Sequence, residues 1–223
     1  MRVTAESTRG SSLFVVEHLS GYVPYREALA RQIERRDQVA RGELPETVFL
    51  LEHAPVFTLG RNAREHHLLR SRDQLEAMGI DVVEVDRGGD VTYHGPGQLV
   101  VYPIIDLTRR NPSVNWYLRA LEQSIIDTLD GFGLCAERLE GYTGVWANGG
   151  KIAAIGVGIH RWISYHGLAI NVDPNMEHWS LIVPCGIPDK PVTSLRALLG
   201  EAPSIGAVAE SVIAALEHNL GPG

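Results

Sequence analysis

Short apolar runs of strand length alternate along this chain with longer stretches of helical periodicity, and this alternation limits the possible folds more than any other feature. The pattern predicts strands over residues 13–19, 47–51, 56–59, 81–85, 98–105, 151–160 and 164–172. It predicts helices over residues 25–41, 72–78, 115–133 and 204–220. Elements interspersed in this way are typical of an α/β or α+β domain that is built on one large mixed sheet.

Local patterns add detail to three of these elements. In the helix over residues 25–41, the periodicity turns Leu29, Ile33 and Ala40 toward the core and turns the charged residues Arg31, Glu34, Arg35, Arg36 and Asp37 toward water. The strands over residues 151–160 and 164–172 are expected to join through a short turn around Arg161 and Trp162. A further short helix is predicted to follow residue 192, with Thr193 or Ser194 as its cap.

Length and composition indicate a single globular domain. The 223 residues suit one large domain or two small ones, and 44% hydrophobic with 21% charged residues is ordinary for a globular protein. No linker, low-complexity tract or internal repeat divides the chain. We therefore expect one domain over residues 13–220, preceded by a flexible arm over residues 1–12.

Charge and cysteine usage bear on location and partners. The net charge of −7 argues against bulk binding of nucleic acid, although a local basic patch remains compatible with it. No apolar run approaches the roughly 20 residues that span a bilayer, and residues 1–12 lack the apolar core of a signal peptide. Two cysteines, Cys135 and Cys185, do not make a disulfide framework, so we expect a cytoplasmic protein with reduced thiols and no membrane partner.

Lysine is almost absent from the chain: among its 20 lysine and arginine residues, only Lys151 and Lys190 are lysines. Arginine stays protonated in proteins and cannot act as a base, whereas a buried amine can lose its proton. Lys151 lies in an apolar segment, which suits such an amine; codon bias with two chance lysines is the alternative. Cys185, in a loop between a proline and a glycine, is a candidate nucleophile, whereas Cys135 is expected to pack as a small hydrophobe.

The loop over residues 87–98 is the densest candidate for ligand binding. Its four glycines and one proline permit unusual backbone angles and a close approach to a ligand. The loop is predicted to cradle a ligand with inward backbone N–H groups, and an elaborate structural turn is the alternative. It matches neither a Walker A motif nor a G-x-G-x-x-G fingerprint, and the histidines of the chain have no zinc-site spacing, so we expect no metal and no cofactor.

Together these residues resemble the lipoyl(octanoyl) transferase family, which is related to the biotin and lipoate ligases. The likeness runs over about residues 50–195 in four separated blocks. The first is 52–61 and the second is 87–98. The third combines 144–146, 151–156 and 166–172, and the fourth combines 184–186 and 192–195. Residues 87–98 carry the family signature Arg-Gly-Gly-x-x-Thr-Tyr-His-Gly-Pro-Gly-Gln at every fixed position. The resemblance implies the α+β catalytic domain of biotin and lipoate ligases, a mixed sheet flanked by helices, and it assigns no role to Lys190.

The same resemblance implies a catalytic acyltransferase domain over residues 13–220, with Cys185 as the acyl-thioester nucleophile and Lys151 as its partner in a Cys/Lys dyad. An octanoyl or lipoyl group would pass from acyl carrier protein to a lysine of lipoyl domains, those of 2-oxoacid dehydrogenase complexes and of the glycine cleavage H protein. The acyl chain would lie against Arg87, Gly88, Gly89, Asp90, Val91, Thr92, Tyr93, His94, Ala154, Ile155, Gly156, Gly167, Leu168 and Ala169. Either Lys151, or His94 through water, would deprotonate the acceptor lysine.

Both partner proteins are typically acidic, so docking is expected to need a local basic surface. Candidates for that surface are Arg61, Arg64, Arg70, Arg72 and some of Arg109, Arg110 and Arg138. Three other functions remain open: an ATP-dependent lipoate or biotin ligase, a non-catalytic module that binds the acyl group or its carrier, and a cysteine hydrolase. Cys185 argues against the ligase, and Lys151 together with Cys185 argues against the binding module.

Overall fold

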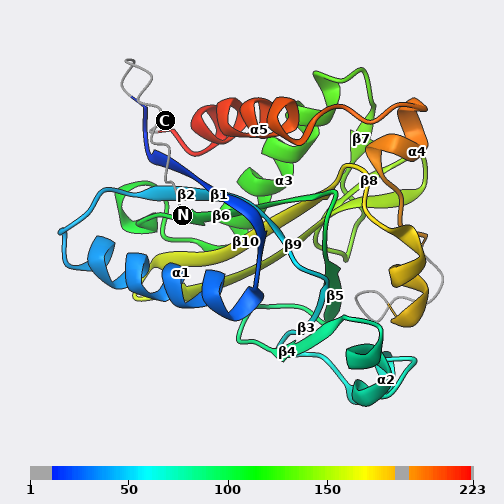
Figure 1. Cartoon of the computed structure of the whole chain (residues 1–223). Helices are drawn as coiled ribbons and strands as arrows, with labels where there is room; N and C mark the ends of the chain where they lie inside the picture. Colours follow the sequence, from blue (N-terminus) through cyan, green and yellow to red (C-terminus); the bar gives the residue numbers. More distant parts are fainter. Residues whose placement is uncertain (1–11, 184–190, 222–223) are drawn as a thin grey trace.

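The computed structural model describes residues 12–183 and 191–221, which form a seven-stranded sheet and a separate three-stranded sheet (Figure 1). In spatial order the larger sheet consists of β1 (Val15–Val23), β2 (Thr47–His53), β6 (Gln98–Ile104), β10 (Ile163–Asn171), β9 (Gly150–His160), β8 (Val145–Ala147) and β7 (Ala136–Glu137). The β1–β2 pair is parallel and every other pair in this sheet is antiparallel. The sheet is therefore mixed, as the sequence predicts.

Helices cover both faces of the larger sheet. Figure 1 shows α3 (Val114–Asp130) and α5 (Ile205–Asn219) on one face and α1 (Tyr25–Ala40) on the other. Strand β2 shows how the two cores arise, because its alternate side chains point to opposite faces. Val48 and Leu50 pack in the core under α3 and α5, whereas Phe49 and Leu51 pack in the core against α1. The fold is thus the α+β class that the sequence predicts.

The smaller sheet lies beside the first one and has its own apolar cluster (Figure 1). It consists of β4 (Asp81–Glu84), β3 (Val56–Leu59) and β5 (Val91–His94), and it packs near α2 (Arg72–Ala77). The remaining helices are three 3₁₀ turns, η1 (Glu65–His67), η2 (Leu107–Arg109) and η3 (Met176–Leu181), and α4 (Leu195–Leu199). Among the described helices, none has the length and apolar character needed to cross a bilayer.

Every long predicted element is present within a few residues of its expected bounds, and Ser194 is the cap of α4. The predicted inner face of α1 is only partly right: Leu29 is half-buried against an apolar cluster, but the buried residues of the helix are Tyr25, Ala28, Gln32 and Val39. Ile33 is 38% exposed. The helix is rotated because the Gln32 side chain accepts a hydrogen bond from the buried His166 backbone N–H at 2.7 Å, a tertiary contact that periodicity does not encode.

Two further expectations are corrected. Residues 91–94 form β5 inside the predicted loop, because their backbone pairs with β3. Cys135 is exposed and is not a buried hydrophobe, since it lies beyond the C-terminal end of α3. The arm over residues 1–12 falls almost wholly outside the described residues and stays a prediction, as does the assignment of residues 13–220 to one domain.

Candidate functional site

A cavity of about 240 Å³ lies among β5, β6, β9 and β10, beside the first residue of α1. Its lining comes from segments that are far apart in the sequence. The lining residues are Tyr25, Asn62, Arg87, Gly89, Asp90, Thr92, His94, Tyr102, Gly141, Tyr142, Thr143, Lys151, Ala154, Ile155, Gly156, His166, Gly167, Leu168 and Ala169. The fold therefore gathers Lys151 and most of the predicted acyl-binding residues around one space.

Three of the predicted acyl-binding residues, Gly88, Val91 and Tyr93, do not line this cavity. For Val91 and Tyr93 the strand geometry of β5 is the reason, because successive side chains of a strand point to opposite sides. Thr92 and His94 face the cavity, while Val91 and Tyr93 pack in the apolar cluster of the smaller sheet. Val91 and Tyr93 therefore support the cavity wall from the apolar cluster of the smaller sheet and do not contact the cavity.

Arg87 braces the glycine-rich loop from inside. Its Nη2 donates to the Thr58 carbonyl oxygen at 2.7 Å and to the Asp90 carbonyl oxygen at 2.8 Å, and its Nη1 donates to the Gly88 carbonyl oxygen at 2.9 Å. A Cβ atom at Gly156 would lie 2.9 Å from Arg87 Cδ. The glycine is therefore required so that β9 can approach the buried arginine.

Lys151 is 8% exposed and lies near the start of β9. Its Nζ donates to the Thr143 carbonyl oxygen at 3.1 Å and lies 5.1 Å from the centre of the Trp146 ring. The neighbouring Gly144 has φ 135°, and a Cβ atom there would meet Lys151 Cε at 2.6 Å. The amine is thus packed into the cavity wall by residues of the segment before β8.

Glu122, a residue that the sequence analysis missed, fixes the same wall from the opposite side. It is 1% exposed on α3, and its Oε1 accepts a hydrogen bond from Gly144 N at 3.2 Å. The other carboxylate oxygen, Oε2, accepts from Arg119 Nη1 at 2.6 Å and from Arg138 Nε at 3.1 Å. A glutamate within an apolar stretch of a predicted helix was the available signal, since a buried carboxylate needs partners.

Hydrogen-bond acceptors fix the tautomers of two histidines beside the cavity, His166 and His53. His166 Nε2 lies 3.0 Å from Asp86 Oδ1, and because a carboxylate only accepts, this nitrogen carries the proton. His166 Nδ1 then accepts from the Tyr25 hydroxyl at 3.2 Å. His53 Nδ1 donates to the Val23 carbonyl oxygen at 2.8 Å, so its Nε2 accepts from the Tyr102 hydroxyl at 2.7 Å. Burial lowers the pKa of each of these imidazoles to about 4.

His94 is oriented by a chain of side-chain amides. The amide nitrogen of Gln98 donates to Asn171 Oδ1 at 2.9 Å, so Gln98 Oε1 accepts from His94 Nδ1 at 2.7 Å. Asn171 Nδ2 in turn donates to the Thr193 carbonyl oxygen at 3.0 Å. Burial, with His53 nearby, lowers the pKa of His94 well below its usual value. His94 is therefore neutral, and the lone pair on its Nε2 can accept a hydrogen bond.

The phenols at the cavity also stay neutral. Burial raises the pKa of Tyr25 to about 12 and the pKa of Tyr102 well above its usual value. Burial acts to raise the pKa of Asp86 as well, but hydrogen bonds from His166 and Tyr165 outweigh it and hold that pKa below its usual value. The aromatic and imidazole floor of the cavity is consequently uncharged at neutral pH, which suits an apolar ligand.

Cys185 and residues 184–190 lie outside the described residues, but both flanks of that segment are described. Val183 N donates to the His67 carbonyl oxygen at 2.8 Å. On the other flank, the Pro191 carbonyl oxygen accepts from Lys151 N at 2.8 Å, and Thr193 N donates to the Lys151 carbonyl oxygen at 3.0 Å. Pro191, the first described residue after that segment, therefore pairs with the backbone of Lys151. Among the described residues, no cluster of histidine, cysteine and carboxylate groups could hold a metal ion.

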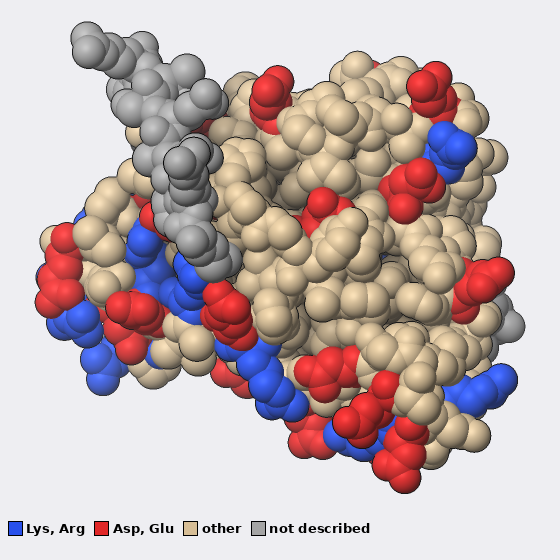
Figure 2. Space-filling model, viewed as in Figure 1, with Lys and Arg blue, Asp and Glu red and all other residues tan. Residues whose placement is uncertain are grey.

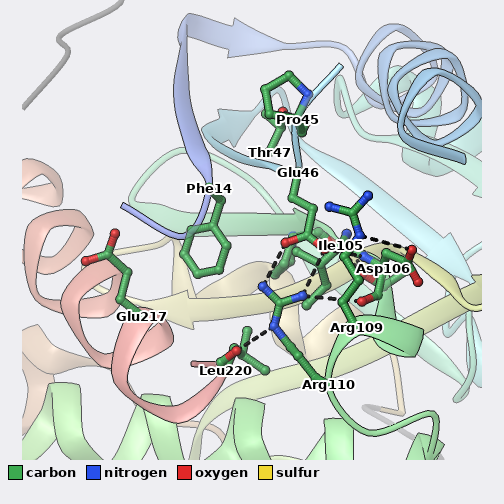
Figure 3. A network of polar contacts seen from close by, with 12 residues as sticks. Phe14, Pro45, Glu46, Thr47, Ile105, Asp106, Arg109, Arg110, Glu217 and Leu220 are labelled. Atoms are coloured by element: carbon green, nitrogen blue, oxygen red, sulfur yellow. Dashed lines mark hydrogen bonds and ion pairs between the residues drawn. The ribbon is translucent and has the colours of Figure 1, made fainter. Parts of the chain in front are cut away.

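Most of the arginines predicted to form a docking surface are already paired. Arg110 is buried and forms a two-pronged ion pair with Glu46, at 2.8 and 2.7 Å (Figure 3). The others with carboxylate partners are Arg72 with Glu65 and Glu84, Arg109 with Asp106, and Arg138 with Glu122. Figure 2 shows basic and acidic side chains side by side along the lower edge of one face. Arg110 is thus excluded, and Arg61, Arg64 and Arg70 remain without an ion pair to a described carboxylate.

Comparison with known proteins points the same way as the geometry. Residues 24–217 match the family described as lipoyl protein ligase A/B catalytic domain. The octanoyltransferase of Chloroflexus aurantiacus is 48% identical over 200 residues, which cover 88% of this chain and 90% of that protein. The octanoyltransferase of Geobacter metallireducens is 47% identical over 192 residues, covering 86% and 87%. The crystal structure of lipoate-protein ligase A bound with ATP aligns with a TM-score of 0.70 at 16% identity, over 91% of this chain and 84% of that one, a likeness of fold alone.

Proposed function

Because this chain belongs to the lipoyl protein ligase A/B catalytic domain family and acts as an acyltransferase of protein lipoylation, we propose that it carries an octanoyl group as a thioester on Cys185. The donor is octanoyl-acyl carrier protein, and the acceptor is a lysine of a lipoyl domain. The reaction takes place in the cytoplasm, where the thiol stays reduced. Lipoyl domains of 2-oxoacid dehydrogenase complexes and the glycine cleavage H protein are the proposed acceptors.

In the first step the thiolate of Cys185 attacks the carbonyl carbon of the donor thioester. A new carbon–sulfur bond forms, the bond to the carrier's sulfur breaks, and the leaving thiolate takes up the proton that Lys151 had received from Cys185. One thioester replaces another, so the step is nearly balanced in energy and depends on orientation. The backbone N–H groups near Cys185 and the glycine-rich loop are the proposed donors to the oxyanion.

In the second step the neutral amine of the acceptor lysine attacks the acyl carbon. The amide carbon–nitrogen bond forms, and the thiolate of Cys185 leaves. We assign the removal of the acceptor's proton to Lys151. His94 is the weaker candidate, because burial lowers its pKa well below its usual value and makes it a poor base at neutral pH. The amide is far less reactive than the thioester, so the reaction runs forward.

The acyl chain occupies the cavity of about 240 Å³ beside Lys151. Burial of six methylene groups would contribute on the order of 5 kcal/mol to binding. Small residues make the room: Ala154, Gly156, Gly167 and Ala169 all line the cavity. The floor of neutral imidazoles and phenols adds no charge that an apolar tail would have to desolvate.

The observation that carries this proposal is the pairing of Pro191 and Thr193 with the backbone of Lys151. It brings Pro191, which follows the segment that bears Cys185, to Lys151, the one buried amine of the cavity wall among the described residues. The test is intact-mass analysis after incubation with octanoyl-acyl carrier protein, followed by peptide mapping. We expect one octanoyl adduct on Cys185, none in Cys185→Ser, and an unchanged adduct in Cys135→Ser, which alters the exposed cysteine.

Other results of these experiments would indicate a different function. A protein that binds the carrier but gains no covalent mass would be a binding module. Octanoyl transfer from free octanoate that depends on ATP would indicate the ligase reaction. We expect Lys151→Arg to lose nearly all transfer activity, because arginine keeps the charge but cannot accept a proton. An active Lys151→Arg enzyme would limit Lys151 to electrostatic support.

Docking of the carrier is proposed to use Arg61, Arg64 and Arg70. These three side chains are exposed and lie close together in the chain, beside the cavity residue Asn62. Because exposed charges are screened by salt, raising the ionic strength should weaken binding of the acyl carrier protein markedly. Binding that does not change with salt would exclude an electrostatic docking surface.

A further inference from the structure

A second groove, of about 450 Å³, adjoins the cavity on the outer side of β9. Its walls are apolar, with Val114 and Leu118 of α3 facing Ile155, Val157 and Ile159 of β9. The glycines at positions 88, 89, 156 and 158 contribute backbone in place of side chains. Gly88, Gly89, Ile155 and Gly156, which the sequence assigned to acyl binding, also line this groove. The acyl chain itself is proposed to occupy the cavity of about 240 Å³.

The groove and the cavity share part of their lining. Gly89, Thr143, Ile155 and Gly156 line both. Thr143 is the residue whose carbonyl oxygen accepts the hydrogen bond from Lys151 Nζ. A ligand with its reactive carbon beside Lys151 can therefore extend one end into the cavity and the other end over Thr143 into the groove.

Arg61 is the one charged side chain that lines the groove among the described residues. Its backbone is fixed to the glycine-rich loop, because Arg61 N donates to the Arg87 carbonyl oxygen at 3.1 Å. Its guanidinium has no hydrogen bond or ion pair with a described residue and remains exposed. The groove also includes Val114, the first residue of the 17-residue helix α3, where the helix dipole favours an anion.

We propose that this groove binds the phosphopantetheine arm of the donor, with Arg61 on its phosphate and the apolar walls against its pantetheine chain. The assignment rests on the proposed function, since it presupposes a carrier-bound thioester. Charge complementarity selects this occupant: a long, mostly uncharged chain that ends in one phosphodiester matches an apolar groove with one available guanidinium. The lipoyl-domain lysine has the opposite charge and would be repelled by Arg61.

The test compares octanoyl thioesters of three thiols as donors: N-acetylcysteamine, pantetheine and 4′-phosphopantetheine. The readout is the rate of acyl-enzyme formation by mass spectrometry. We expect Arg61→Ala to lower kcat/KM about tenfold for the phosphopantetheine thioester only, as expected for loss of a hydrogen bond to a charged group. Val114→Trp, which adds bulk at an exposed wall, should raise KM for both pantetheine donors and leave the short thioester unchanged. The control Arg41→Ala alters an exposed arginine that is paired with Glu43.

The possible results distinguish failure of the proposed function from failure of the groove assignment. Failure of all three thioesters to acylate the wild-type enzyme would refute the proposed function itself. Normal acylation with equal kcat/KM for phosphorylated and unphosphorylated donors, unchanged by Arg61→Ala and Val114→Trp, would overturn the groove assignment alone. An equal loss with all three donors in Arg61→Ala would place Arg61 in the reaction centre and would also overturn it.

Discussion

Glu122 and Lys151 hold the two sides of a single peptide unit. The carbonyl oxygen of Thr143 accepts from Lys151 Nζ at 3.1 Å, and the N–H of Gly144, in the same peptide plane, donates to Glu122 Oε1 at 3.2 Å. Because a peptide plane is rigid, its rotation would break both contacts together. A buried carboxylate on α3 therefore positions the amine on β9 without touching it.

This relationship predicts a graded response at position 122. Glu122→Ala should lower the rate of acyl transfer by about 10- to 100-fold, the value of a hydrogen bond to a charged group. Glu122→Gln should recover much of that loss, because an amide oxygen still accepts from Gly144 N. The pH profile of kcat should shift in the alanine variant and not in the glutamine variant. Gln123→Ala, which removes another partner of Arg138, is the control; an equal loss there would assign the effect to Arg138.

Gly144 is expected to be irreplaceable for a reason specific to Lys151. Gly144→Ala would force a side chain to φ 135° and bring its Cβ within 2.6 Å of Lys151 Cε and 2.8 Å of the Ala153 carbonyl oxygen. We expect activity to fall more than tenfold and the free energy of unfolding to fall by about 1–3 kcal/mol. Gly149→Ala is the matched control, since Gly149 has φ 78° with nothing near its Cβ. It should lose stability and keep activity, and loss of activity there would weaken the specific role of Gly144.

The stability of the fold should rise with pH between about 4 and 6.5. Burial lowers the pKa of His53 from 6.5 to about 4 in the folded chain, so the unfolded chain binds more protons in this window. This stabilisation is fully present above pH 6.5 and is lost as the pH falls toward 4. For His53 the loss amounts to at most about 3 kcal/mol in the free energy of unfolding. Urea unfolding between pH 5 and 7 should show a shallower pH dependence in His53→Gln than in the wild type. His18→Gln, which alters an exposed histidine, is the control.

The ion pair of Arg110 and Glu46 predicts a large effect on stability and a small one on catalysis. Both side chains are almost completely buried, at 6% and 5% exposure, and Arg110 Nε also donates to the Leu220 carbonyl oxygen, which ties down the end of α5 (Figure 3). Arg110→Met leaves the Glu46 carboxylate buried without its partner and should cost about 3–5 kcal/mol in denaturant unfolding. The double variant Glu46→Leu/Arg110→Met should be more stable than Arg110→Met alone. A single variant with wild-type stability would show that the pair contributes nothing net.

Local sequence signals predicted the helices and strands because each of these elements repeats its own pattern over many residues. The helix α3 and the antiparallel strands β9 and β10 are examples, and so is the turn between them, where Arg161 and Trp162 have φ 49° and 66°. The prediction failed at α1, where burial of Gln32 depends on a contact with His166, 134 residues away. It also missed β5, whose partner β3 lies outside any local window.

The sequence by itself determined the residue types on which the proposed chemistry depends: a rare lysine in an apolar segment, a cysteine in a proline–glycine loop, and a glycine-rich signature. These are properties of single segments and can be read without coordinates. Only the tertiary structure decided that Glu122, Gly144 and Lys151 share one wall, that Val91 and Tyr93 face away from the cavity, and that Arg110 is buried. Each of those outcomes depends on packing between distant segments, and packing acts on three-dimensional neighbours that the order of residues does not reveal.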